Sequence, residues 1–238
     1  MKKQPLLMLS VFALVFSLLS SCSNKCEKGS GKAATAARKV GSFTKIDVSG
    51  NYKIVLRQGS PSVKITADDN LIKSIKTDVN GDELNISTNG NICNAGQMII
   101  NITNPDFQAI KSSGVLDLSS DSTLNVKTFD MELAGVSKVN LNLIAGNVKT
   151  STSGTAEINL KGQASENMVT MNGTSTLNAL DFVVANYRIE TRGATHCKIN
   201  VLDQLSVNIK EAGEVLYKGN PSKINNEHSG AATLKKIE

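Results

Sequence analysis

The sequence MELAGVSKVNLNLIAGNVKTSTSGTAEINL, residues 131–160, contains Ala134-Gly135 and Ser153-Gly154, two pairs of a small residue and glycine that lie 19 residues apart and are each followed by alternating apolar and polar residues. Pairs of this kind, each ending in glycine, recur 17–21 residues apart: Ser113-Gly114, Ala134-Gly135, Ser153-Gly154, Asn172-Gly173, Arg192-Gly193, Ala212-Gly213 and Ser229-Gly230. A fixed repeat of this length is typical of proteins that stack one supersecondary unit on the next. The sequence therefore predicts an all-β solenoid with coils of about 20 residues.

Apolar residues keep the same positions relative to these glycines. Four residues after successive glycines stand Leu118, Val139, Ile158, Leu177, Cys197 and Tyr217, followed two residues later in the middle coils by Leu141, Leu160, Ala179 and Ile199. A second apolar set precedes the glycines and comprises Ile110, Met131, Val169, Ile189 and Ile209, with Phe129, Val148, Tyr187 and Val207. This alternation predicts strands with one buried face. Between the strands, glycine is expected to form a corner with positive φ or a close backbone approach.

Polar residues fill the outward positions between the apolar columns. Asn140, Asn159 and Asn178 form one such column. They are expected to make either a ladder of side-chain amides along the stack or an ordinary polar surface.

The segments on either side of the repeat are expected to close its two ends. Alternating apolar residues between 43 and 102, with turns at 58–61 and 80–82, predict a β-rich N-terminal lead-in. Only residues 70–76, NLIKSIK, have a helical spacing. The lead-in would cap one end of the stack, and residues 216–238, where the repeat breaks at Asn220-Pro221, would close the other.

The N-terminus has the layout of a secretory signal. Lys2 and Lys3 precede an uncharged stretch whose apolar part, residues 6–19, is shorter than the roughly 20 residues of a membrane-spanning helix. The stretch ends in Leu19-Ser20-Ser21-Cys22, which resembles the lipobox of bacterial lipoproteins. We therefore expect a lipoprotein signal peptide over residues 1–21 and a lipid on Cys22 that anchors the protein to a membrane. An ordinary signal peptide with an incidental cysteine is the alternative.

The residues after Cys22 bear on location and on flexibility. Ser23 follows the cysteine, which by resemblance to lipoprotein sorting favours the outer membrane and leaves open which side the protein faces. Small and charged residues dominate up to position 40 and offer little to bury, so residues 22–40 are expected to be a flexible tether. The domain proper would then cover residues 41–238.

Charge, aromatic content and cysteine spacing exclude several kinds of partner. The net charge is +5, of which the signal segment supplies two, so the rest is too weakly basic for nucleic-acid binding. The chain has no Trp and only 4 % aromatic residues, which argues against a stacking platform for sugars. Apart from Cys22, the chain has Cys26, Cys93 and Cys197. One disulfide among these three is compatible with the sequence, which favours no particular pairing. Their spacing does not suggest a zinc site.

Three places contain residue types that occur in catalytic or metal sites. Asp68-Asp69 comes directly before residues 70–76, the short segment with a helical spacing of apolar residues, and Asp in such a position most often caps a helix or solvates a turn. His196 and Cys197 are neighbours on a predicted strand and would point to opposite faces, so they cannot act as a nucleophilic pair, and Cys197 is expected in the core. His228 has no suitable partner nearby in sequence and is expected on the surface. We predict no catalytic residues, metal or cofactor.

The sequence resembles the "putative auto-transporter adhesin, head GIN domain" family of Bacteroidetes lipoproteins. The resemblance rests on GSFTKIDVSGNYKIVLRQGSPSVKITADDN at residues 41–70, on NGDELNIS at residues 80–87 and on the glycine repeats through YKGNPSKI at residues 217–224. It covers roughly residues 41–238 and implies a right-handed parallel β-helix with a role at the cell surface or in the envelope. The family supplies no catalytic or ligand-binding residues that could be transferred to this chain.

Three functions follow from these features. The first is a non-enzymatic adhesin or surface-interaction module, in which outward residues such as Lys138 and Glu157 contact a protein or glycan. The second is a structural or stress-related envelope component without a fixed ligand. The third is a polysaccharide lyase or hydrolase, which the scattered outward charges of mixed sign disfavour.

Overall fold

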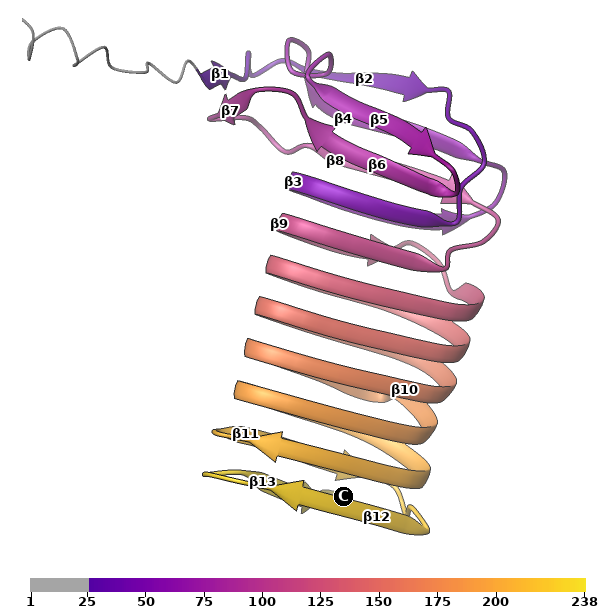
Figure 1. Ribbon diagram of the computed structural model, residues 1–238. Helices are drawn as coiled ribbons and strands as arrows, with labels where there is room; N and C mark the ends of the chain where they lie inside the picture. The colour runs from indigo at the N-terminus through magenta and orange to yellow at the C-terminus, as the bar shows by residue number, and fades with distance from the viewer. Residues whose placement is uncertain (1–25) are drawn as a thin grey trace, which may run out of the picture.

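The computed structural model describes residues 26–238, which form β-strands joined by turns and loops, with no helix among them. The signal peptide expected over residues 1–21 and the lipidation expected at Cys22 lie outside the described residues. The strands stack into one tall column with the N-terminal strands at one end and the C-terminal strands at the other (Figure 1). The all-β class is confirmed.

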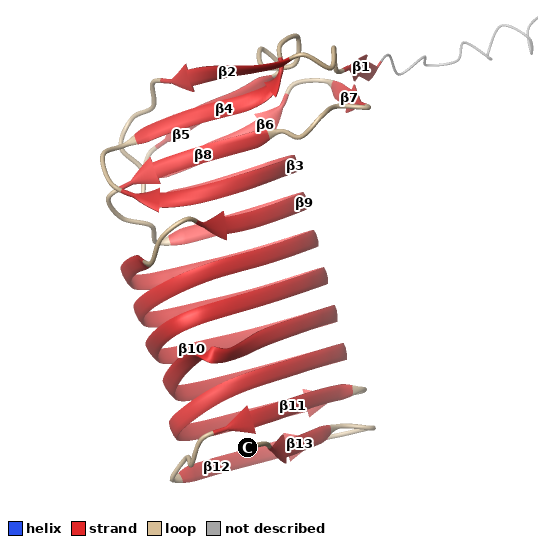
Figure 2. Ribbon diagram, turned by 180° about the vertical axis from the view of Figure 1, so that it is seen from behind, coloured by secondary structure: helices blue, strands red, loops and turns tan. Residues whose placement is uncertain are grey.

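Most of the described chain is extended, and the connections are short (Figure 2). The strands are β1 (Cys26–Lys28), β2 (Ala33–Arg38), β3 (Lys45–Gln58), β4 (Ser62–Asp68), β5 (Ile75–Asn80), β6 (Glu83–Thr88), β7 (Asn91–Cys93), β8 (Ile99–Asn104), β9 (Ala109–Ser120), β10 (Leu124–Lys210), β11 (Gly213–Lys218), β12 (Lys223–His228) and β13 (Thr233–Lys236). β10 alone has 87 residues and winds back on itself turn after turn (Figure 1).

The glycines set the register between neighbouring turns. Gly50 of β3 pairs with Gly114 of β9, and Gly114 pairs in parallel with Gly135 of β10. The five glycines from Gly114 to Gly193 in this column have φ between 93° and 132°. A Cβ added to any of them would lie 2.3–2.5 Å from the carbonyl oxygen of the preceding corner glycine. Both predicted reasons for glycine, positive φ and close backbone approach, are confirmed at these corners.

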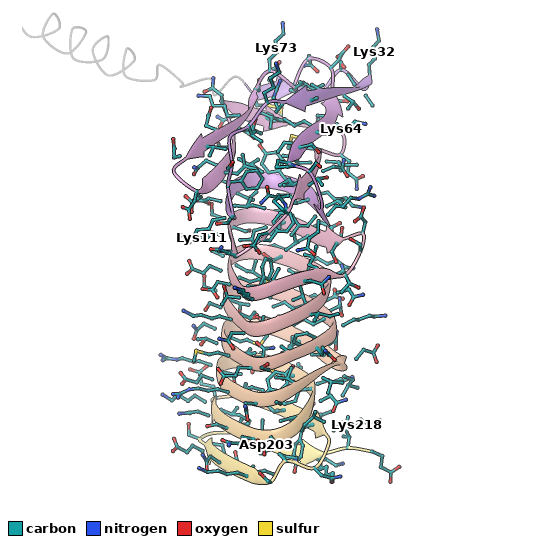
Figure 3. All side chains as sticks on the ribbon, turned by 90° about the vertical axis from the view of Figure 1, so that its right-hand side faces the viewer. Lys32, Lys64, Lys73, Lys111, Asp203 and Lys218 are labelled. Carbon is teal, nitrogen blue, oxygen red and sulfur yellow. A yellow bond between two sulfur atoms is a disulfide. The ribbon has the colours of Figure 1, made fainter. Side chains whose placement is uncertain are left out.

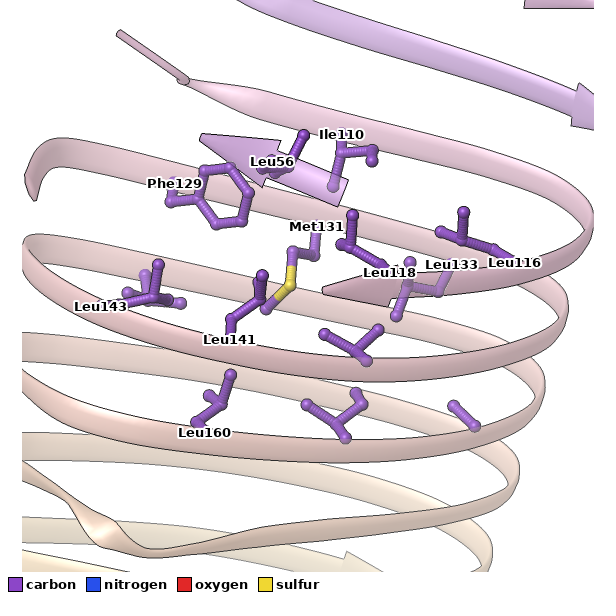
Figure 4. Close-up of a cluster of buried hydrophobic side chains, with 14 of the residues drawn as sticks. Leu56, Ile110, Leu116, Leu118, Phe129, Met131, Leu133, Leu141, Leu143 and Leu160 are labelled. Carbon is purple, nitrogen blue, oxygen red and sulfur yellow. The ribbon is translucent and has the colours of Figure 1, made fainter. Parts of the chain in front are cut away.

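The predicted apolar columns face the interior. Leu118 pairs with Val139, and both are fully buried, as are Ile158 and Leu177. Figure 4 shows Leu118, Met131 and Leu141 pointing into the space enclosed by successive turns. Each such side chain contributes about 1.5–3 kcal/mol through burial. The core therefore runs the length of the stack as one continuous cluster.

The outward asparagines form the amide ladder. Asn159 Nδ2 donates to Asn140 Oδ1 at 3.0 Å, and Asn178 Nδ2 donates to Asn159 Oδ1 at 2.9 Å. Since Asn159 donates to one neighbour and accepts from the other, it ties together the turns above and below it. Of the two alternatives, the ladder is correct.

The predicted register is wrong at the last corner. Gly213 pairs with Thr195 rather than with Gly193, and it is buried inside the turn. The corner is taken by Glu211, a non-glycine residue with φ of 71°, and a Cβ on Gly230 would lie 2.7 Å from its carbonyl oxygen. The inward column consequently continues from Cys197 to Val215, and Tyr217, predicted in that column, pairs with Ile199 and is only half-buried.

The flexible tether predicted over residues 22–40 is wrong for its described part. β2 pairs antiparallel with β4, and β1 pairs in parallel with β7. The small residues of β2 need little burial to be ordered because all six residues of this edge strand pair with β4. Residues 70–76 do not form a helix either: a turn follows β4, with the N–H of Leu71 donating to the carbonyl of Asp68 at 2.9 Å, and β5 begins at Ile75.

The C-terminal segment occupies the far end of the stack (Figure 1). β12 pairs in parallel with β10, and β13 pairs in parallel with β11. Its side chains are mostly exposed, and Ile224 is 43 % exposed. These strands therefore extend the winding of the repeat rather than folding across it.

Substitution Gly154→Ala is expected to lower the free energy of unfolding by at least about 2 kcal/mol. The added Cβ would meet the Gly135 carbonyl oxygen at 2.3 Å at a φ of 132°, so two backbones must separate. Urea unfolding followed by circular dichroism measures the loss. Ser153→Ala, on the exposed neighbour, is the control, and equal stability of the two variants would contradict the corner assignment.

Substitution Asn159→Ala is expected to cost about 1–2 kcal/mol because it removes both amide bonds of the central rung. Asn140→Ala removes only one of these bonds and should cost less. The same urea titration separates them. Asn172→Ala is the control, because Asn172 is exposed and no hydrogen bond of its side chain is observed in the described chain. It should change the free energy of unfolding by less than about 0.5 kcal/mol. A loss equal to that of Asn159→Ala would count against the ladder.

Candidate functional site

The loop between β6 and β8, residues 89–98, leaves the stack at the first glycine corner. β6 pairs with residues 45–49 of β3 and β8 pairs with residues 53–58. The two strands therefore cover β3 on either side of Gly50, and the chain between them projects from the stack at that corner. This loop carries β7 and ends at Met98, whose carbonyl accepts from the N–H of Lys53 at 2.9 Å.

A disulfide joins the loop to the N-terminal segment. Cys26 in β1 is bonded to Cys93 in β7, 67 residues apart in sequence, and Cys197 remains a buried free thiol. The sequence left this pairing open because nothing local distinguishes the three cysteines. The bridge fixes the start of the described chain to the projecting loop.

Hydrogen bonds fix the same segment to the turn after β4. Ser30 N donates to Asn70 Oδ1 at 2.9 Å, and Asn70 Nδ2 donates to the carbonyl of Lys28 at 2.8 Å. The carboxylate of Asp68, only 6 % exposed, accepts from the N–H of Gly96 in the loop at 2.9 Å. The Asp68-Asp69 pair thus stabilises a turn and its neighbours, as its simpler interpretation predicted.

A groove of about 1290 Å³ runs beside this loop along the outer side of the glycine corners. The loop residues Ile92 and Met98 line it at one end. Along the stack its surface includes Val115 and Val136, which are 45 % and 53 % exposed and pair with each other in the parallel register. These are large apolar side chains left open to solvent on adjacent turns.

Charges of alternating sign flank the two valines. Asp117, Lys138 and Glu157 line the groove on successive turns, and Lys138 Nζ lies 3.8 Å from Glu157 Oε2. Farther along, Thr155, Thr174 and Thr176 provide hydroxyl groups. The groove therefore offers apolar contact, hydroxyls and locally balanced charge, which suits binding a partner by several weak contacts.

The groove contains one aromatic residue, and it is committed to the fold. Tyr52 is 1 % exposed, and its hydroxyl is hydrogen-bonded to the Thr88 hydroxyl. Burial raises the pKa of Tyr52, and the bond to Thr88 opposes that rise. Tyr52 stays protonated and buried, so it does not present a ring face for a sugar.

The structure separates the remaining candidate residues. Cys197 is 1 % exposed, and burial raises the pKa of its thiol to about 12, so it is a protonated core residue. His196 points outward, with its Nδ1 3.5 Å from Glu214 Oε2. His228 is exposed on β12. The prediction that His196 and Cys197 point apart is confirmed, and among residues 26–238 no group of three or more His, Cys, Asp or Glu side chains is placed to hold a metal ion.

Sequence reasoning missed the groove. The signal that could have revealed it is the pair Val115 and Val136, each directly after a corner glycine in an outward position where later turns have Thr155 and Thr174. The position of loop 89–98 beside them depends on contacts distant in sequence. No helix within residues 26–238 is long and apolar enough to cross a bilayer.

The fold and the groove define a class: all-β proteins whose strands stack into a column with a groove along one side. A family model described as "Putative auto-transporter adhesin, head GIN domain" matches residues 42–221, and the chain belongs to this family. A search of curated proteins finds no match.

Solved structures from several bacteria share the fold. A putative adhesin from Bacteroides fragilis is 24 % identical with a TM-score of 0.85, covering 89 % of this chain and 100 % of that one. A putative lipid binding protein from Parabacteroides distasonis is 19 % identical with a TM-score of 0.70, covering 90 % and 100 %. A putative adhesin from Parabacteroides merdae is 21 % identical with a TM-score of 0.63, covering 89 % and 99 %. At these identities the likeness concerns the fold alone.

Replacement of both bridged cysteines, Cys26→Ser with Cys93→Ser, is expected to loosen the loop and its attached segment. Loss of a covalent link across 67 residues should lower the free energy of unfolding by roughly 2–4 kcal/mol. Hydrogen exchange should accelerate in residues 26–30 and 89–98 and stay unchanged in residues 131–141 of β10, which serve as the internal control. Unchanged exchange in the loop would mean that hydrogen bonds alone hold it.

Proposed function

We propose that this protein is a lipid-anchored, non-enzymatic component of the cell envelope that binds a protein or glycan partner through the groove beside loop 89–98. The observation that carries the proposal is the pair of exposed valines, Val115 and Val136, in a groove whose neighbouring loop is fixed by a disulfide. Exposed apolar contacts on a rigid support are typical of binding surfaces. The adhesin description of the family supports the same function.

The proposed location is the outer membrane, with the protein attached through lipid on Cys22 after removal of residues 1–21. The sequence Leu19-Ser20-Ser21-Cys22 supports the cleavage and acylation, and Ser23 supports the choice of membrane. The disulfide between Cys26 and Cys93 fits an oxidising compartment outside the cytoplasm.

We further propose that the wound strands are a right-handed parallel β-helix with coils of about 20 residues. The parallel register between corner glycines and the continuous apolar interior support this architecture. It would give the groove a surface that repeats from coil to coil.

A polysaccharide lyase or hydrolase is the weaker interpretation. Such enzymes need carboxylates and cations gathered around one bond of the substrate. In the groove, Asp117, Lys138 and Glu157 lie on successive turns, and Lys138 and Glu157 neutralise each other. Their spacing favours surface pairing over catalysis.

The test is binding of the mature protein to a panel of purified glycans and bacterial or host surface proteins. Val136→Lys, which places a charge between the groove's apolar side chains, is expected to weaken any binding found by roughly tenfold or more, about 1.4 kcal/mol. Leu202→Lys is the matched control, since Leu202 is 56 % exposed and does not line the groove. Equal effects of the two variants would remove the groove as the binding site.

Two other outcomes would replace the proposal. Turnover of a polyanionic glycan by the purified protein would establish an enzyme. Absence of binding across the panel, together with an envelope defect on deletion of the gene, would favour a structural or stress-related component without a fixed ligand.

A further inference from the structure

The disulfide shortens the connection between Cys22 and the folded domain. Cys26 is fixed to Cys93, so only residues 23–25 separate the proposed lipid attachment from an anchored position. Four residue steps span at most about 14 Å, whereas a free tether from 22 to 40 would span about 60 Å. An acylated Cys22 therefore holds the N-terminal end of the stack close to the bilayer surface.

Exposed lysines gather at this same end. Five of them lie on β1, directly before β2, on β4, on the turn between β4 and β5, and on β5. They are Lys28, Lys32, Lys64, Lys73 and Lys76, and together they are called the cationic cap. Figure 3 shows Lys32, Lys64 and Lys73 at one end of the molecule and Asp203 and Lys218 toward the other. None of the five ammonium groups has a carboxylate within 4.0 Å in the described part of the chain.

Three of the carboxylates near the cationic cap, those of Asp68, Asp69 and Glu27, are hydrogen-bonded to other parts of the fold, whereas Asp78 on β5 is exposed. Asp68 is buried and accepts from the N–H of Gly96. Asp69 accepts from Ser30 Oγ at 2.5 Å, and Glu27 accepts from Ser74 Oγ at 3.0 Å. These bonds hold the three carboxylates against the fold; each keeps its negative charge, but none lies within 4.0 Å of an ammonium group of the cationic cap.

The sides of the stack are electrostatically different from the cap. Charges on adjacent turns pair with opposite sign, as in Lys111–Glu132 at 3.9 Å, Lys138–Glu157 at 3.8 Å and Lys161–Asp181 at 4.0 Å. Two opposite charges a few Å apart leave almost no net charge when seen from a distance, and salt screens the remainder over a Debye length of about 8–10 Å. The lysines of the cap are not paired in this way, so the cap is better able than the sides of the stack to attract an anionic plane.

We propose that the cationic cap docks on the anionic headgroups of the bilayer that holds the Cys22 lipid. The stack then stands with β2 toward the membrane and β12 and β13 directed away from it. Lysines close to an anionic surface add a salt-dependent attraction that a lipid anchor alone does not supply. The inference rests on the proposed acylation of Cys22 and assigns the anchored domain an orientation.

The test uses the mature, acylated protein reconstituted into vesicles of phosphatidylcholine alone or with about one-third phosphatidylglycerol. Amine-reactive labelling read by mass spectrometry should fall severalfold at Lys32, Lys64 and Lys73 on the anionic vesicles relative to the neutral ones. Labelling of Lys198, Lys210 and Lys218, which are exposed in the distal half, should not change. High salt should abolish the difference.

Two triple variants complete the experiment. Lys32→Glu with Lys64→Glu and Lys73→Glu should remove the lipid-dependent protection still measurable at Lys28 and Lys76. Lys198→Glu with Lys210→Glu and Lys218→Glu should preserve it. Wild-type protein that floats with both vesicles but is labelled equally on both would overturn the docking. Protein that floats with neither would overturn the lipid anchor itself.

Discussion

The close stacking of corner backbones is the constraint on which the structure depends. Each corner glycine lies so near the carbonyl of the preceding one that a side chain is excluded, and this contact fixes how one turn is placed on the next. Once that register is set, alternation along the strand decides which residues enter the core. The same register brings Asn159 onto Asn140, Lys138 onto Glu157 and Val136 onto Val115. Core, amide ladder, charge pairing and groove thus share one geometric origin.

The sequence predicted what the repeat encodes and missed what depends on distant contacts. Buried Leu118, Val139 and Ile158 were predictable because period-two alternation is local. The last corner was not, since Glu211 adopts a conformation normally favouring glycine and moves Gly213 inside. Residues 26–38 were predicted to be flexible because β4, which pairs with β2, and Cys93 lie far away in sequence. The groove was missed for the same reason.

The molecule divides its surface into parts with different physical character. Along the turns, opposite charges neutralise each other pair by pair, which leaves apolar Val115 and Val136 as the distinctive feature of the groove. At the N-terminal end, Asp68 and Asp69 bond to the fold itself, and the five lysines of the cationic cap have no carboxylate within 4.0 Å in the described chain. One end is thereby suited to a charged plane, and the adjoining groove is suited to a specific partner. The segment that begins at Cys26 contributes to both, because it carries Lys28 and Lys32 of the cationic cap and is bridged to the loop beside the groove.

The bridge between Cys26 and Cys93 also determines how mechanical load would travel through an anchored molecule. With the proposed lipid on Cys22, tension would enter at Cys26 and pass through a covalent bond directly into the loop that lines the groove. A partner held in that groove would therefore pull against its anchor along a path only a few residues long. The turns of β10 that follow Asn178 do not line the groove, so additional turns there would not lengthen this path.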